Sequence, residues 1–216
     1  MSRGRRLFAH TLTGAAVALF VCGCGGSGGS TGDDNTSAGA GKVGSASASP
    51  SVSAGTDRPR VTLPSDLTYT FDWPSTGDAV KDAVLADSEQ NIKAVDLAIA
   101  NQDPLDKAYR FYFEGEAAAQ IQRYVQAYVT AKARTTGHYR YYDPVVNVSA
   151  PDEASLVYCE DQGKAYDFYL KTKKVDRTAV TRNSYVLYST QLHKNDEGVW
   201  VTEKLSSQRG SAKCQP

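Results

Sequence analysis

SYVLYSTQLHKNDEGVWVTEKLSS, residues 184–207, predicts two β-strands joined by a short polar turn. Tyr, Val and Thr recur on both sides of the turn, and these residue types favour the pleated, half-buried surface of a sheet. The turn, residues 195–198, ends in a glycine, which tolerates the backbone conformations of tight turns. We therefore expect an antiparallel hairpin near the C-terminus.

Three segments before this hairpin have the same strand-like composition. They cover residues 138–150, 154–162 and 164–172, and turn-forming residues separate them. Pro144 interrupts the first segment, which predicts a bend or a bulge, because proline cannot donate a hydrogen bond to a neighbouring strand. The second half of the chain therefore predicts a mostly antiparallel sheet.

Residues 75–137 predict three helices in series before any strand. Apolar residues spaced three and four apart follow Ser75 and Thr76, either of which suits the N-cap of the first helix. A second, short helix is predicted over 103–115, where an Asp-Pro pair marks the start and a glycine the end. The third helix is predicted over 116–137, with Gly137 as its stop. The fold class expected is α+β, with N-terminal helices packed in a strongly curved antiparallel sheet.

The N-terminus has the pattern of an export signal. Residues 1–10 contain three arginines and no acid, and the uncharged segment 11–22 that follows is roughly 12 residues long, too short to span a bilayer. We therefore expect a signal peptide over 1–23. Arg5 and Arg6, followed by Leu-Phe, resemble the twin-arginine export motif, and a generic basic segment is the alternative.

The end of this signal resembles the lipobox of bacterial lipoproteins. Val21 at −3 and Gly23 at −1 precede Cys24, whereas Cys22 follows the branched Val21. The resemblance implies that Cys24 carries a thioether-linked diacylglyceryl group, whose chains hold the protein at a membrane. A C-x-C metal or redox site would need further ligands held rigidly nearby, and the glycine- and serine-rich sequence that follows supplies none.

Residues 24–60 predict a disordered tether, and residues 61–216 predict one folded domain. The tether is rich in Gly, Ser and Ala and has too little apolar surface to offset the entropy of ordering. The full chain has 24 basic and 24 acidic residues, and loss of the three signal-peptide arginines leaves 21 against 24. A slightly acidic mature chain with no basic stripe argues against nucleic-acid binding.

Two cysteines remain in the domain after the signal and anchor cysteines are set aside. Cys159 and Cys214 are an even number in an exported protein, so we expect a disulfide between them. The alternative is a free buried thiol in a strand and a loose terminal thiol. No motif for a metal or another cofactor is present, and we expect none to bind.

Several of these features together resemble a known family. The signal and tether, the helical opening, LVYCEDQGK (156–164) and YVLYSTQLHKNDEGVWVTEKL (185–205) are similar to actinomycete secreted lipoproteins of unassigned function, whose domain resembles nuclear transport factor 2. The resemblance covers roughly residues 62–214 and implies a cone: a curved sheet wrapped around helices, with a pocket inside. That superfamily contains isomerases, cyclases, dehydratases and many noncatalytic modules, so the fold does not imply an activity.

Four side chains are candidates for lining such a pocket: Asp161, Asp143, Tyr112 and Tyr124. Strand alternation places Asp161 on the face of Cys159 and Glu160 on the opposite face, so Asp161 lines the pocket only if the disulfide face is inward. The tyrosines fit either a pocket wall or plain core. Two histidines remain after export: His193, beside the polar turn, is expected at the surface, and His138, after the expected helix stop, is a weak candidate for a catalytic base.

The sequence therefore predicts a lipid-anchored protein on the outer face of the cytoplasmic membrane. The function expected is noncatalytic: holding a small apolar ligand or a cell-envelope protein. The alternative is a small isomerase, cyclase or dehydratase that uses a carboxylate base, which needs an acidic group desolvated in the pocket.

Overall fold

The computed structural model describes residues 58–216. The predicted signal peptide, Arg5, Arg6, Cys24 and most of the predicted tether lie outside the described residues. Within the described part of the chain, no helix is long and apolar enough to cross a membrane.

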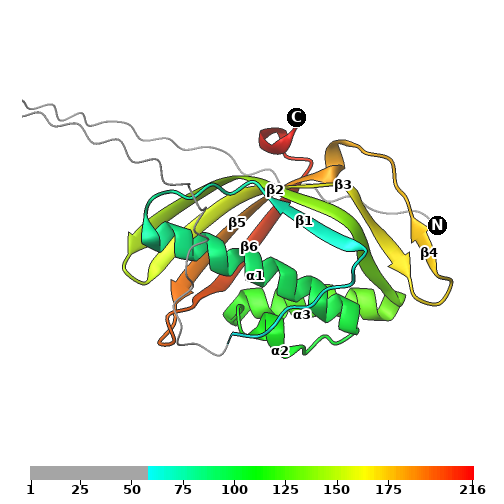
Figure 1. Ribbon diagram of the computed structural model, residues 1–216, viewed down its shortest axis with the longest axis horizontal. Coiled ribbons are helices and arrows are strands. Elements are labelled where there is room, and N and C mark those ends of the chain that lie inside the picture. Colours follow the sequence, from blue (N-terminus) through cyan, green and yellow to red (C-terminus); the bar gives the residue numbers. More distant parts are fainter. Residues whose placement is uncertain (1–57) are drawn as a thin grey trace, which may run out of the picture. The chain divides into compact units, whose positions relative to one another are not determined.

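The described chain is a curved mixed sheet with three helices on one face, and the predicted α+β class is confirmed (Figure 1). The strands run in the order β1-β2-β3-β5-β6, and the short β4 pairs with β3. Only β1 and β2 are parallel among the pairs in this sheet. The elements are β1 (Leu67–Phe71), α1 (Ala79–Asn101), α2 (Lys107–Arg110), α3 (Gly115–Ala131), β2 (Ala133–Ala150), β3 (Glu153–Tyr169), β4 (Lys174–Asp176), β5 (Tyr185–Lys194) and β6 (Trp200–Arg209).

The prediction that no strand precedes the helices is wrong. Strand β1 comes before α1 and pairs in parallel with β2, with Leu67 opposite Gly137 and Phe71 opposite Tyr141. A parallel pair needs a long crossover connection, and the three helices supply it. The five-residue strand depends on this distant pairing, which local periodicity does not show.

Helix α1 begins a few residues later than predicted. The N-cap is Asp78, whose carboxylate accepts hydrogen bonds from the backbone amides of Val80 and Lys81 at 2.8 and 3.1 Å. Ser75 and Thr76 instead donate their hydroxyl hydrogens to Asp82, both at 2.7 Å. An ionised Asp accepts more strongly than a hydroxyl at a helix N-terminus, so the cap falls where the acid lies.

The second and third helices are shorter than predicted. Helix α2 is a single turn capped by Asp106, and α3 ends at Ala131 with Lys132 in the left-handed conformation. Gly137 is therefore not a helix stop but a residue of β2, where its φ is +97°. A Cβ there would lie 2.2 Å from the carbonyl oxygen of Lys164, so only glycine permits this approach of β2 to β3.

The predicted irregularity at Pro144 is present. The β2–β3 register shifts between Tyr142 and Val145, and Asp143 in that bulge has φ +51°. Further shifts follow along the same strand pair. Bulges increase the local twist of a strand, which allows these two long strands to curve around the helices.

The predicted hairpin and disulfide are both confirmed. Strands β5 and β6 are antiparallel and joined by the turn at 195–198. Cys159 of β3 is bonded to Cys214 in the C-terminal turn η2 (Ala212–Cys214), which lies on the side of the sheet opposite the helices (Figure 1). The hydroxyl of Tyr142 also donates to the carbonyl of Cys214. Because η2 lies opposite the helices, the face of β3 that carries the disulfide is the outer face of the sheet.

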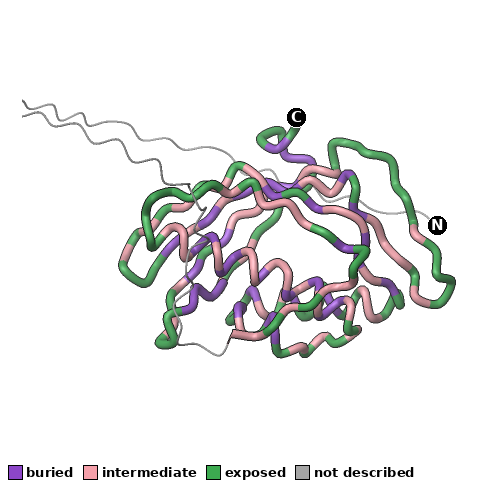
Figure 2. The backbone as a smooth tube through the Cα atoms, in the orientation of Figure 1, coloured by how far each residue is buried: buried purple, intermediate pink, exposed green. Residues whose placement is uncertain are grey.

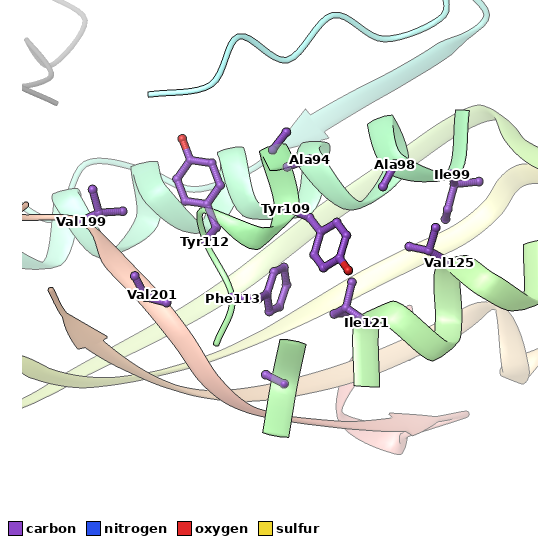
Figure 3. Packing of buried hydrophobic residues seen from close by; sticks show 12 residues of the cluster. Ala94, Ala98, Ile99, Tyr109, Tyr112, Phe113, Ile121, Val125, Val199 and Val201 are labelled. Atoms are coloured by element: carbon purple, nitrogen blue, oxygen red, sulfur yellow. The ribbon is translucent and has the colours of Figure 1, made fainter. Parts of the chain in front are cut away.

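Two buried clusters connect the helices to the sheet, and buried segments line their facing surfaces (Figure 2). One cluster joins the three helices to β6; its members include Tyr109, Tyr112 and Ile121 (Figure 3). The other packs Val84 and Leu85 of α1 against the concave face of the sheet. Between α1, α3 and the sheet, the side chains enclose a cavity.

Candidate functional site

The cavity has a volume of about 280 Å³ and is partly open to solvent. Its walls come from both helices and from β2, β3, β5 and β6. The lining residues are Asn91, Ile92, Val95, Asp96, Phe113, Gln120, Ile121, Tyr124, Tyr139, Tyr141, Tyr158, Glu160, Tyr188, Leu205, Ser207 and Arg209. A concave, mostly apolar wall with a few convergent polar groups is typical of a small-molecule site.

Glu160 is a carboxylate held at the wall of this cavity. It lies on β3 on the same face as Leu156 and Tyr158, and only 4% of its surface is exposed. Tyr141 donates its hydroxyl to one carboxylate oxygen at 2.8 Å, and the side-chain amide of Gln162 donates to the other at 2.6 Å.

Burial raises the pKa of Glu160 above its ordinary value. The hydrogen bonds from Tyr141 and Gln162 oppose this shift because they favour the ionised form, and the nearby Asp96 carboxylate adds to it. Desolvation is the largest cause, so the net direction is upward. Glu160 is therefore better suited to exchanging a proton near neutral pH than an exposed glutamate is.

Asp96 is a second buried acid at the cavity, on α1. One carboxylate oxygen accepts the hydroxyl of Tyr69 at 2.6 Å, and the other accepts the hydroxyl of Thr135 at 2.7 Å. Burial raises the pKa of Asp96 as well, against the effect of these two hydrogen bonds. Both oxygens are fixed by strands β1 and β2, so Asp96 ties α1 to the sheet while it faces the cavity.

Five tyrosines surround the two acids: Tyr124, Tyr139, Tyr141, Tyr158 and Tyr188. Burial raises the pKa of each phenol, and the pKa of every one lies far above neutral. Tyr124 lines the cavity and keeps 45% of its surface exposed. All five phenols are therefore neutral hydrogen-bonding groups at neutral pH.

A chain of hydrogen bonds connects Arg209, at the rim of the cavity, to Glu160 through Gln162. Arg209 donates from one guanidinium nitrogen to the side-chain carbonyl of Gln162 and to the backbone carbonyl of Asn183, each at 2.8 Å. Because the carbonyl of Gln162 faces Arg209, its NH₂ group faces Glu160. Arg209 thus orients the donor that contacts the buried carboxylate.

Of the four side chains predicted to line a pocket, only Tyr124 lies at this cavity. Asp161 is on the opposite, disulfide-bearing face of β3, where its carboxylate accepts the amide of Gly163 at 2.7 Å. Asp143 is exposed in the β2 bulge. Tyr112 is fully buried in the core between the helices and β6 (Figure 3).

Glu160 is the main residue that the sequence interpretation missed as a site. Strand alternation already places Glu160 on the face opposite to Cys159 and Asp161. Its neighbours on its own face, Leu156 and Tyr158, are apolar or aromatic. An acid that continues an apolar strand face is a signal for a buried carboxylate. Assigning Glu160 to a pocket requires knowing which face of β3 points inward. The disulfide identifies the outer face only when the side of the sheet on which it lies is known.

The two histidines of the described chain lie away from the cavity. His138 contacts the hydroxyls of Thr68 and Thr70 on β1. His193 lies between Glu114 and Glu203, with nitrogen–oxygen distances of 3.2 and 3.4 Å. The ligand atoms of this second group are within 4.8 Å of one another, but about half of each glutamate side chain is solvent-exposed, and we assign no metal to them.

Comparison with known proteins shows likeness at the level of fold alone. No family model and no curated protein sequence matches the chain. Similar solved structures include a ketosteroid isomerase-like protein from Erwinia carotovora (12% identity over 62% of this chain and 98% of that one, TM-score 0.42). Others are a nuclear transport factor 2-like superfamily protein from Salmonella enterica (12%, 61% and 93%, 0.41) and a hexachlorocyclohexane dehydrochlorinase from Novosphingobium barchaimii (8%, 60% and 88%, 0.39). At such low scores the likeness carries no argument about function.

Proposed function

We propose that this domain binds a small, largely apolar ligand in the cavity between α1, α3 and the sheet. The observation that carries the proposal is the cavity itself: about 280 Å³ of open space, with apolar walls and a buried, hydrogen-bonded Glu160. Natural interiors are close-packed, so an unfilled space of this size next to the core is a feature of the fold that a ligand can occupy. Ile92, Val95 and Leu205 supply apolar contact, and the polar groups fix the ligand's orientation.

The proposal places this binding domain outside the cell, on a lipid anchor at Cys24. Its supports are the basic and apolar N-terminus, the lipobox-like Val21-Cys22-Gly23-Cys24, and an intact disulfide in the domain. Disulfides persist in oxidising compartments, which agrees with export. A cell-envelope protein that receives or delivers the ligand is the partner proposed.

A pair of matched substitutions tests ligand binding in the cavity. Val95 lines the cavity, whereas Val145 is 64% exposed on β2. We expect Val95→Phe to fill part of the cavity and to weaken the binding of ring-containing fragments at least tenfold, while Val145→Phe leaves it unchanged. The measurement is ligand-observed NMR with a library of small neutral and charged aromatic compounds. Equal binding by the two folded variants would contradict the proposal.

A second candidate function is acid–base catalysis by Glu160, as in a small isomerase or dehydratase. The observation that favours it is the raised pKa of a buried carboxyl that faces the cavity. Enolisation requires such a base close to the substrate carbon that loses its proton. Purified protein is assayed with enolisable ketones. Activity that Glu160→Gln abolishes without unfolding supports this function, and activity that survives the substitution excludes Glu160 as its base.

A further inference from the structure

We propose that the ligand of this cavity carries a positively charged ammonium group, which lies against Glu160 among the tyrosine rings. This inference rests on the proposed binding function and names the chemical class of its ligand. It follows from which hydrogen-bond donors the protein has already used, from the aromatic faces around the acids, and from the position of the nearest basic side chain.

The hydrogen-bond donors that contact Glu160 are already used by its carboxylate. Tyr141 directs its hydroxyl hydrogen at one carboxylate oxygen, and Gln162 directs an amide hydrogen at the other. A phenol that donates its hydrogen to a carboxylate offers only oxygen lone pairs to anything else. A ligand that reaches Glu160 therefore meets carboxylate and phenol oxygens and must bring its own hydrogens.

Asp96 repeats this arrangement on the helix side of the cavity. Its two oxygens take the hydroxyl hydrogens of Tyr69 and Thr135. The cavity therefore contains two buried acids whose carboxylates accept hydrogen bonds from neutral side chains. Within the described chain, neither Glu160 nor Asp96 forms an ion pair with a lysine or an arginine. A buried acid without a cation nearby is normally neutralised by a proton. A cation bound next to the carboxylate also compensates its negative charge.

The aromatic walls also favour a cation. The rings of Tyr158 and Tyr188 are stacked with their centroids 5.2 Å apart, and Tyr141 meets Tyr158 edge to face at 6.0 Å. Tyr139 and Tyr124 complete the aromatic wall. Cations are attracted to the negative faces of such rings, most strongly where water is excluded. Acids and aromatic faces together are how proteins recognise organic ammonium groups.

Among the described residues, Arg209 is the one basic side chain that lines the cavity, and it is exposed at the rim. One guanidinium nitrogen is occupied by Gln162 and Asn183. Its charge is therefore screened by solvent, unlike the charges of the buried acids. An anionic ligand group would need to pass Arg209 and approach Glu160 and Asp96, where no positive charge of the described chain compensates it.

Three aromatic probes of similar size test the charge preference: benzylammonium, benzyl alcohol and benzoate. Their dissociation constants for the purified domain are measured at pH 7 by calorimetry and by NMR shifts of the cavity residues. We expect benzylammonium to bind at least tenfold more tightly than benzyl alcohol, and benzoate more weakly than either. We expect Glu160→Gln to remove the preference for benzylammonium over benzyl alcohol, and Asp161→Asn, its matched control on the outer face of β3, to keep it.

The outcomes separate this inference from the binding function beneath it. If benzyl alcohol or benzoate binds in the cavity as tightly as benzylammonium, the ammonium inference is overturned and the binding function stands. A preference for benzylammonium that Asp161→Asn abolishes and Glu160→Gln retains also overturns it. If none of the three probes shifts a cavity residue at millimolar concentration, both proposals are overturned.

Discussion

Replacing Glu160 with Gln should change how the stability of the protein depends on pH. In the unfolded chain this carboxyl titrates near its ordinary pKa of 4.5, and in the folded protein burial raises its pKa. Below pH 4.5 the Glu160 carboxyl is protonated in both states, so its titration does not change the free energy of unfolding. As pH rises from there to the folded-state pKa, only the folded state still holds the proton, so the free energy of unfolding falls.

The size of this effect follows from the same linkage. Each pH unit between the unfolded and folded pKa values lowers the free energy of unfolding by about 1.4 kcal/mol, and the loss stops above the folded pKa. Glu160 is 4% exposed, so solvent does little to screen it. The carboxyl of Asp96, whose pKa burial also raises, is present in both proteins and largely cancels in their difference.

Urea unfolding, followed by tryptophan fluorescence at a series of pH values from 4 to 8, measures the difference between wild type and Glu160→Gln. We expect the stability of wild type to fall relative to the variant as pH rises above 4.5. Asp161→Asn, on the outer face of the same strand, is the control and should follow wild type. Parallel stability curves for wild type and Glu160→Gln would refute the placement of Glu160 as a desolvated acid.

Three further predictions concern the disulfide, the β2–β3 approach and the anchor. Reduction of the Cys159–Cys214 bond, which spans 55 residues, should lower the free energy of unfolding by about 4 kcal/mol, and equal urea midpoints with and without reductant would contradict this. Gly137→Ala should cost on the order of 1–3 kcal/mol, because the new Cβ meets a carbonyl of β3; an unchanged melting temperature would show that β2 can move away. Cys24→Ser should abolish incorporation of a fatty-acid probe while Cys22→Ser retains it, and loss of label in Cys22→Ser alone would assign the anchor to the other cysteine.

The amino-acid sequence by itself determined the elements whose evidence is local. The hairpin of β5 and β6 follows from alternating strand residues around the 195–198 turn, and the bulge follows from Pro144. The disulfide follows from cysteine number and the export signal. These predictions need only the chain's own periodicity and the chemistry of single residues, and they do not depend on how the helices pack on the sheet.

Only the tertiary structure decided which strand face is inside and where each element ends. Strand β1 exists because it pairs with β2 across the three helices, and Gly137 lies in that pairing and not at a helix end. Alternation separates Asp161 from Glu160 but is symmetric between the two faces of a strand. The helices cover one face and the disulfide-linked C-terminus covers the other, and this packing puts Glu160 at the cavity and Asp161 outside it.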